Sequence, residues 1–302
     1  MTSSLNILIT GSKSGLGRLM AETLARHGHH VIASMRDVAT RNAGAAGELR
    51  GFTADGGGSI RTVEIDAASD ESVERGVKEA LELTGGRIDV AINNAGLGTF
   101  GLTEGFVAAQ LHALFNLNVC GAQRVNRAVL PGMRARGAGL LIHITSAIGR
   151  MVMPTMGPYC ASKFALEALA EAYRYELSGT GVDSTIIEPG AYPTDFLTGA
   201  LLPGDPSRAP GYGPLSQLPE QLGAGLGAML SGPNAPNPQL VADAVAKLIA
   251  TPVGQRPLRT VVDMHPEGVE AINRVCEQVQ AGTLGAMGLG GLAQVAVREQ
   301  AS

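Results

Sequence analysis

The sequence predicts an α/β fold: a doubly wound parallel sheet of about seven strands with helices on both faces, in one domain. Three observations support this fold. Short β-branched runs alternate with longer amphipathic stretches, as in repeated βαβ units. A glycine-rich turn joins the first apolar run to the first amphipathic stretch. The chain has 302 residues, 45% of them hydrophobic and 17% charged, so it can bury a large core.

Each element has its own signal. The first helix, at residues 15–28, places Leu16, Leu19 and Leu24 on one face. The helix at residues 70–83 opens with acidic side chains, which the helix dipole favours. The predicted strands are residues 5–10, 30–34, 60–66, 88–93, 140–145, 182–188 and 259–263. The predicted helices are residues 15–28, 70–83, 104–136, 159–178 and 239–250.

One domain accounts for this alternation, since no internal repeat and no second set of units follows it. We assign residues 1–265 to a Rossmann-type domain and residues 266–302 to a C-terminal helix with a Gly-rich tail. Gly, Pro, Ser and Leu dominate residues 199–238, a stretch too long for a structureless connection in a compact domain. We therefore interpret residues 197–238 as a substrate loop or lid.

The composition argues against several kinds of partner. A net charge of −4 without basic runs does not fit a nucleic-acid-binding protein. Residues 278–297 lack charged side chains but contain five glycines, so we expect no membrane insertion. The three cysteines form no CxxC pair, and no signal peptide is visible, which favours a cytoplasmic location.

Histidines give no metal site. His27, His29 and His30 lie close together, but no Cys or carboxylate set completes a coordination sphere, so a solvated turn is expected there. His143 lies in a predicted strand, and we interpret it as a hydrogen-bonded core residue. Cys160 follows Tyr159 directly; adjacent helical residues do not share a face, so we assign it to packing.

The glycine-rich turn is TGSKSGLG, residues 10–17. Gly11, Gly15 and Gly17 have neither the GxGxxG spacing nor the ending of a Walker loop. Glycines nevertheless let a backbone approach a pyrophosphate, and the N-terminus of the following helix offers free N–H groups. On its own, the turn fits a nucleotide site and a purely structural turn equally well.

A second motif, YCASK, places Tyr159 and Lys163 four residues apart on one helical face. A neighbouring cation lowers the pKa of a phenol toward a range useful for proton transfer. Pairs at this spacing are also ordinary helix chemistry, so this motif alone does not decide the function.

Polar residues end two predicted strands. Ser146 follows the strand at 140–145, and NNAG (residues 93–96) ends the strand at 88–93. Open α/β sheets bind ligands at this carboxyl edge. Asn118 lies inside a helical pattern, where asparagine has poor propensity, so we expect a function for its side chain.

Together these motifs resemble the short-chain dehydrogenase/reductase family in identity, order and spacing. The resemblance covers residues 5–194 and extends loosely to the strand near residue 259. The matching motifs are Thr10-Gly11-x-x-x-Gly15-x-Gly17, Asn93-Asn94-Ala95-Gly96, Asn118, Ser146, Tyr159-x-x-x-Lys163 and Pro189-Gly190.

The resemblance implies an enzyme that interconverts a carbonyl and an alcohol by hydride transfer with a nicotinamide cofactor. Tyr159 would be the general acid or base, and Ser146 would hydrogen-bond the substrate oxygen. Lys163 would lower the pKa of Tyr159 and hold the nicotinamide ribose, while Asn118 would anchor a proton-relaying water chain. These four residues are the predicted catalytic set.

The resemblance also implies a cofactor site. Its glycine turn would hold the pyrophosphate, Asp66 the adenine and Thr194 the nicotinamide carboxamide. The predicted cofactor-binding residues are Gly11, Lys13, Ser14, Gly15, Leu16, Gly17, Arg36, Asp66, Asn93, Ala95, Gly96, Tyr159, Lys163, Pro189, Gly190 and Thr194.

The end of the second strand favours NADP(H) over NAD(H). An NAD site usually has an acid there, but Ser34 and Met35 occupy this place and Arg36 follows. An arginine can bind a 2′-phosphate through two hydrogen bonds, and Lys13 adds a second cation. Two alternatives stay open: Arg36 pairs with Asp37 or with solvent, or a register shift of one makes Asp37 the ribose acceptor. NAD(H) remains the alternative cofactor.

The substrate is expected to be an apolar carbonyl or alcohol. Met151, Met153 and Met156 lie between Ser146 and Tyr159, so they either border the substrate or fill a gap in the core.

The family further implies a homodimer or homotetramer formed through the long helices at 104–136 and 159–178. A non-catalytic dinucleotide-binding regulatory protein is the alternative from another functional class.

Overall fold

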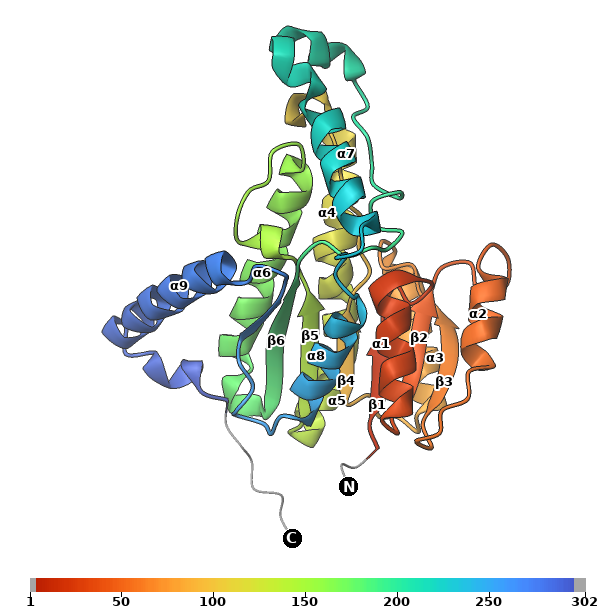
Figure 1. Ribbon diagram of the computed structural model, residues 1–302. Helices are drawn as coiled ribbons and strands as arrows, with labels where there is room; N and C mark the ends of the chain where they lie inside the picture. The colour runs from red at the N-terminus through yellow and green to blue at the C-terminus, as the bar shows by residue number, and fades with distance from the viewer. Residues whose placement is uncertain (1–3, 296–302) are drawn as a thin grey trace.

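A single parallel sheet forms the centre of the structure, a computed structural model that describes residues 4–295. The strand order is β3-β2-β1-β4-β5-β6-β7, and every pairing is parallel (Figure 1). The chain changes direction across the sheet between β1 and β4, the place where open α/β sheets bind ligands. The strands are β1 (Asn6–Ile9), β2 (His30–Met35), β3 (Ser59–Glu64), β4 (Val90–Asn93), β5 (Gly139–Ile144), β6 (Val182–Pro189) and β7 (Arg259–Val262).

Helices cover both faces of this sheet (Figure 1). Helices α1 and α8 pack on one face, and α3, α5 and part of α6 on the other. The helices are α1 (Gly15–Arg26), α2 (Ala43–Arg50), α3 (Asp70–Leu83), α4 (Ala108–Phe115), α5 (Gly121–Arg136), α6 (Gly157–Glu176), α7 (Leu218–Ser231), α8 (Gln239–Ala250) and α9 (Glu267–Ala286).

The alternation of side chains along each strand divides the core into two layers. On β1, Ile7 and Ile9 face α1 and α8, whereas Leu8 faces α3 and α5. All three are completely buried. Full burial of such a side chain contributes about 1.5–3 kcal/mol, so the sheet is a stable base for the loops at its carboxyl edge.

The predicted fold class is confirmed, with differences in particular elements. Strand β2 extends to Met35, one residue beyond its predicted end, and α2 was not predicted. The helix expected at 104–136 is three segments: α4, a π-helical segment η2 (Asn116–Cys120) and α5.

The predicted loop at 197–238 contains regular structure. A 3₁₀ segment η5 (Pro206–Gln217) and helix α7 rise above the carboxyl edge of the sheet (Figure 1). Neither element has a buried residue, and Leu215 and Met229 are exposed. A role as a substrate lid stays a prediction.

The C-terminal region begins with the expected helix, α9, followed by a short 3₁₀ segment η6 (Gly290–Ala293). Residues 296–302 of the predicted tail lie outside the described residues. Within the described part of the chain, no helix has the length and apolarity that crossing a membrane requires. The assignment of residues 266–302 as a separate segment stays a prediction.

Candidate active site

Ser146 lies just after β5, at the carboxyl edge of the sheet. It is the N-cap of the 3₁₀ segment η3 (Ala147–Gly149), where its Oγ accepts a hydrogen bond from the Ile148 N–H at 3.3 Å. The same hydroxyl is 3.4 Å from the carbonyl oxygen of Pro189, the last residue of β6. The neighbouring strands β5 and β6 therefore fix the position of Ser146.

Tyr159 and Lys163 lie in the first two turns of α6, and both are almost fully buried. The Tyr159 backbone N–H donates to Thr99 Oγ1 at 3.1 Å, and the ring packs against Phe196 at a centroid distance of 5.3 Å. Lys163 Nζ donates to the carbonyl oxygen of Ile144 at 2.8 Å and lies 5.7 Å from the Tyr159 ring centroid. The predicted phenol–ammonium pair is thus present on one helical face.

Burial dominates the protonation of this pair. It raises the pKa of Tyr159 above its ordinary value, and a hydrogen bond with Ser146 acts in the opposite direction. Burial also lowers the pKa of Lys163 to about 8, against the charge of Glu167, which raises it. We predicted that Lys163 lowers the pKa of Tyr159; in the structure the main effect on the phenol is desolvation, and it has the opposite sign.

Asn118 lies in the π-helical segment, where its side chain is buried. Its Oδ1 accepts from the Leu97 N–H, and its Nδ2 donates to Leu97 O, each at 2.9 Å. Nδ2 also donates to Ser162 Oγ at 3.0 Å. The side chain therefore ties the segment after β4 to helix α6, which gives a physical reason for asparagine here. Isolated π turns are frequent at functional sites.

The glycine turn is packed tightly against the segment after β4. Gly11 has φ +70°, and a Cβ there would lie 2.9 Å from Ala95 Cα. Thr10 Oγ1 accepts from the N–H groups of Asn94 and Ala95, each at 3.0 Å. Asn94 Nδ2 donates to Thr10 O and Gly11 O, so the two segments are joined by four hydrogen bonds.

The segment after β4 also lies close to Asn118 and Lys163. A Cβ at Gly96 would lie 3.3 Å from Asn118 Oδ1 and 3.7 Å from Lys163 Nζ. The preceding Asn93 is turned away from this surface, because its Nδ2 donates to Asn126 Oδ1 inside the core. Segment 94–96 is therefore the structural connection between the glycine turn and the Tyr159–Lys163 pair.

The fit of the site to a dinucleotide can be judged from the start of α1. This helix begins at Gly15; its N-cap Ser14 makes no side-chain capping bond, and its first turn contains no acid. Its leading N–H groups and its dipole therefore favour an anion, as a pyrophosphate site requires. Leu16 packs on the core below, and Lys13 is exposed. These residues fit the phosphates of a nicotinamide dinucleotide.

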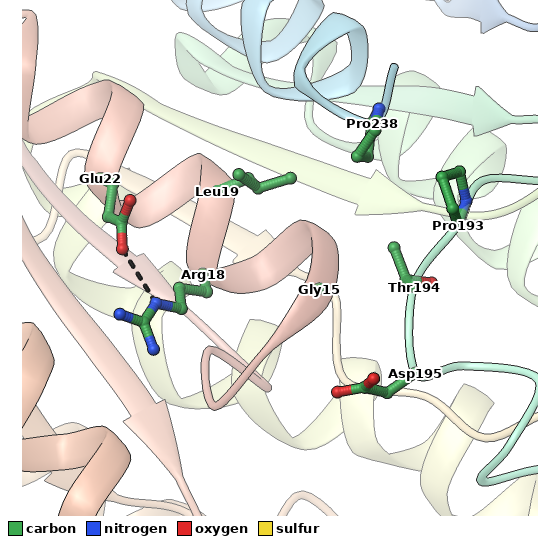
Figure 2. Close-up of a pocket in the computed structure, with 8 residues that line it drawn as sticks. All are labelled: Gly15, Arg18, Leu19, Glu22, Pro193, Thr194, Asp195 and Pro238. Carbon is green, nitrogen blue, oxygen red and sulfur yellow. Dashed lines mark hydrogen bonds and ion pairs between the residues drawn. The ribbon is translucent and has the colours of Figure 1, made fainter. Parts of the chain in front are cut away.

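A pocket of about 260 Å³ opens beside this helix start. Figure 2 shows Thr194 and Asp195, from the segment after β6, facing Gly15 and Arg18 of α1. A Cβ at Gly15 would be 3.5 Å from Thr194 Cβ, so Thr194 lies at the glycine turn as expected. Arg18 is bound to Glu22, its i,i+4 neighbour on α1, at 2.9 Å. Its place in the pocket was not anticipated, because the pocket depends on tertiary structure.

Pro189 and Gly190 turn the chain out of the sheet. Gly190 N–H still bonds to Val262 O at 2.8 Å, and a Cβ at Gly190 would collide with the carboxylate of Asp263. The close approach to Asp263 explains the glycine at this position. It also directs the chain toward Thr194 and the pocket.

The end of the site next to β2 and β3 is exposed to solvent rather than buried. Arg36 is the first residue after β2 and is exposed, and its carbonyl oxygen accepts from Asn42 Nδ2 at 2.6 Å. Asp37 pairs with Arg41 at 2.6 Å, so the alternative in which Arg36 pairs with Asp37 is not observed. Among residues 4–295, neither Arg36 nor Lys13 takes part in an ion pair. Asp66 Oδ1 accepts from the Ala68 N–H at 3.0 Å at the end of β3.

Apolar side chains surround the Tyr159 ring. Met156 and Cys160 are buried with it, and Phe100, Ile148 and Phe196 pack on this cluster. Of the other methionines, Met153 is exposed and Met151 reaches Gly268 of α9. Met156 therefore packs in the core beside Tyr159, one of the two places expected for these methionines, and Cys160 has the expected packing role.

The expectations about histidines were right in part: His143 is a core residue, and His27 and His30 are exposed, but two details differ. His143 is completely buried but has no hydrogen-bond partner at either ring nitrogen among the described residues. Burial lowers the pKa of His143 to about 3, and the nearby charge of Lys163 adds to this effect. His29 is buried rather than solvated, and its Nδ1 accepts from the Leu5 N–H at 3.3 Å.

Several contributors to the site had no recognisable signal in the sequence. Thr99 and Phe196 each contact Tyr159, but from distant parts of the chain. Ser162 lies inside the YCASK motif, but its contact with Asn118 joins two segments that are far apart in the sequence. Thr10 was visible within the glycine-turn motif, and its position before Gly11 could have indicated the hydrogen bonds that it makes to the segment after β4.

Comparison with known sequences identifies related proteins. The profile of the family described as short chain dehydrogenase matches residues 5–201. The chain is 37% identical over 194 residues to uncharacterized oxidoreductase YbbO of Escherichia coli (strain K12), covering 63% of this chain and 67% of YbbO. It is 35% identical over 213 residues to retinol dehydrogenase 8 of Homo sapiens, covering 69% of this chain and 65% of that protein. The similarity thus spans two thirds of the length of these relatives.

Solved structures give similar matches over more of the chain. A short-chain dehydrogenase from Streptomyces avermitilis has a TM-score of 0.75 and 27% identity, covering 96% of this chain and 99% of that one. An alcohol dehydrogenase from the archaeon Thermococcus sibiricus, complexed with 5-hydroxy-NADP, has a TM-score of 0.67 and 27% identity. The match covers 86% of this chain and 96% of that one.

Proposed function

Because the chain belongs to the short-chain dehydrogenase family, we propose that it is an NADP(H)-dependent oxidoreductase that interconverts an apolar carbonyl and its alcohol. Membership already makes it a nicotinamide-dependent oxidoreductase acting on CH–OH or C=O groups. The observation that carries the proposed reaction is the buried Tyr159–Lys163 pair, near the Ser146 hydroxyl, which acts to lower the pKa of the phenol.

In carbonyl reduction, the Ser146 hydroxyl donates a hydrogen bond to the substrate oxygen and stabilises the charge that develops there. The Tyr159 hydroxyl transfers its proton to the same oxygen as the alcohol forms. NADP(H), when bound, supplies or accepts the hydride. In alcohol oxidation, the phenolate of Tyr159 takes the hydroxyl proton instead.

Lys163 and Asn118 support this proton transfer. The Lys163 ammonium stabilises the phenolate form of Tyr159 once it has lost its proton. A pKa of about 8 lets the ammonium exchange its own proton near neutral pH. Asn118 holds the segment after β4 and Ser162 in fixed positions around Lys163.

The cations at the end of β2 support NADP(H) as the cofactor. The guanidinium of Arg36 is exposed, and the neighbouring carboxylate of Asp37 is occupied by Arg41. A 2′-phosphate would therefore meet Arg36 and Lys13 without a free acid immediately beside them. The turn from Gly11 to Gly17 and the N-terminus of α1 would hold the pyrophosphate.

An apolar substrate is supported by the surroundings of Tyr159. Met156, Phe100, Ile148 and Phe196 form an apolar wall beside the phenol. Helix α7 adds mostly Leu, Met, Gly and Ala above the same edge, with a single charged residue, Glu220. We further propose a homodimer or homotetramer through α5 and α6, since Phe164 of α6 is exposed, and a cytoplasmic location.

The test is a panel of apolar ketones and aldehydes with their alcohols, assayed with NADPH and NADH in parallel by cofactor absorbance. We expect turnover with NADPH and a much lower kcat/KM with NADH. Comparable or higher kcat/KM with NADH would instead make it an NAD-dependent alcohol dehydrogenase. Tight NADPH binding without turnover on any member would favour a regulatory dinucleotide-binding protein.

A further inference from the structure

Helix α9 lies beyond residues 5–201, the part that matches the family profile, yet it contacts the base of the catalytic site. It contacts β7, the edge strand, and projects outward from that side of the sheet (Figure 1). Val269 and Asn273, one turn apart on α9, are buried against the domain. An amide buried at such a contact needs hydrogen-bond partners.

Both ends of the Asn273 amide are hydrogen-bonded to charged groups. Its Oδ1 accepts from Arg150 Nε at 2.7 Å, and its Nδ2 donates to Glu188 Oε2 at 2.5 Å. A guanidinium only donates and a carboxylate oxygen accepts, so these partners fix the orientation of the amide. The direct Arg150–Glu188 distance is 4.0 Å, so the amide completes the connection between them.

Arg150 and Glu188 each lie next to one of the two segments that hold Ser146 in place, the η3 segment and the end of β6. Arg150 directly follows the η3 segment that Ser146 caps. Glu188 directly precedes Pro189, whose carbonyl oxygen lies 3.4 Å from Ser146 Oγ. Asn273 therefore links the two segments whose relative position determines where the Ser146 hydroxyl points.

Glu188, the carboxylate to which the Asn273 amide donates, is buried among other charged groups. Glu188 is fully buried and faces Glu167 of α6, Arg259 of β7, Arg150 and Asn273. Arg259 Nε is 2.9 Å from Glu167 and 3.6 Å from Glu188. The same guanidinium also pairs with Glu171 of α6 and Glu277 of α9, so one cation is shared by four carboxylates. Burial and the charge of Glu167 raise the pKa of Glu188 to about 8.

We infer that Asn273 is a positioning residue for catalysis: by joining Arg150 to Glu188, it holds Ser146 in place relative to Tyr159. This inference rests on the proposed function, because it assigns Asn273 an effect on the reaction of Ser146. It also gives α9 a direct role in the active site.

Three variants test it: N273L, N273D and the exchange variant E188Q/N273D. N273L removes both hydrogen bonds, and we expect kcat to fall about tenfold with the Kd for NADPH changed less than about twofold, because a small misplacement of a reacting group has this cost. Melting temperatures identify any loss of folding. Q278E, a change from amide to carboxylate at an exposed position of α9, is the matched control and should behave as wild type.

N273D provides a readout that a purely structural role would not change. At pH 6 the two facing carboxyl groups share a proton, which restores the hydrogen bond, and kcat should be close to that of wild type. As the pH rises to 9 the proton is lost, the carboxylates repel, and the ratio of variant to wild-type kcat should fall. E188Q/N273D exchanges amide and carboxylate between the positions, so its ratio should not change with pH.

The inference is overturned if N273L has wild-type kcat below its melting temperature, or if the N273D ratio is constant from pH 6 to pH 9. Crystal structures of wild type and N273D at pH 9 give a measurement independent of turnover: Ser146 should be displaced while Tyr159 is not. An inactive wild-type protein would refute the proposed function, and the crystal structures would still decide whether Asn273 positions Ser146.

Discussion

The two ends of the candidate site are built in opposite ways. At one end, Tyr159 and Lys163 are buried, packed and hydrogen-bonded, and burial shifts the pKa of both. At the other end, Lys13 and Arg36 are exposed to solvent, and no ion pair holds either of them among residues 4–295. Substitutions at the buried end should therefore lower kcat, whereas substitutions at the exposed end should change only the affinity for the cofactor.

The largest effect is expected at the buried end. Y159F removes the hydroxyl that transfers the proton, and we expect kcat to fall by about 10³-fold, within the usual contribution of general acid catalysis. The Kd for NADPH, measured by fluorescence titration, should change little. Retention of most of the activity would show that another group supplies the proton.

At the exposed end, R36A should act on affinity alone. Losing charge-assisted hydrogen bonds to a 2′-phosphate should raise the KM for NADPH about 30-fold. The kinetic constants with NADH should not change, because NADH lacks that phosphate. R50A, which removes another exposed arginine, is the control. Equal effects of R36A on both cofactors would refute 2′-phosphate recognition.

The smallest effect concerns stability near the buried end. His143 is held neutral with a pKa of about 3, whereas its ordinary value is 6.5. Below pH 6.5 the unfolded chain binds a proton that the folded protein does not, so stability falls as the pH decreases. This loss should reach about 1.4 kcal/mol at pH 5.5 relative to pH 8.

The measurement is urea denaturation of wild type and H143N across this pH range. The slope of unfolding free energy against pH should be smaller in H143N by the contribution of this one group. The same substitution at the exposed His27 is the control. Identical slopes for wild type and H143N would mean that His143 binds a proton as readily in the folded protein as in the unfolded chain, so that its pKa is not lowered by folding.

The sequence was sufficient for the sheet and for most of the motif residues, because buried strands have continuous apolar runs and glycine turns have few alternatives. It did not reveal α2 (AGAAGELR) or α7, whose glycines lower helix propensity although the structure is helical. The π turn at Asn118 was also missed, because a single extra residue shifts the apolar pattern by only one position, which amphipathic helices often show without such a turn.

The pKa shifts of the site residues could not be predicted from the sequence either. The spacing of Tyr159 and Lys163 correctly placed the two groups on one face, but the sign of the pKa shift of Tyr159 depends on how much water reaches it. Burial is a property of the complete fold, to which Phe100 and Phe196 contribute from distant segments. The Asn273 contacts depend on the fold in the same way.

The position of the last strand matters for anyone who shortens or recombines this protein. The family profile ends at residue 201, but β7 completes the sheet beside β6, and α8 places Val241, Val245 and Ile249 in the core. A fragment cut at the profile boundary would lose the α8 side chains from one core layer and expose β6 as an unprotected edge, which invites aggregation. The segment recognised by homology is therefore shorter than the segment that must be kept in a chimera or a truncation.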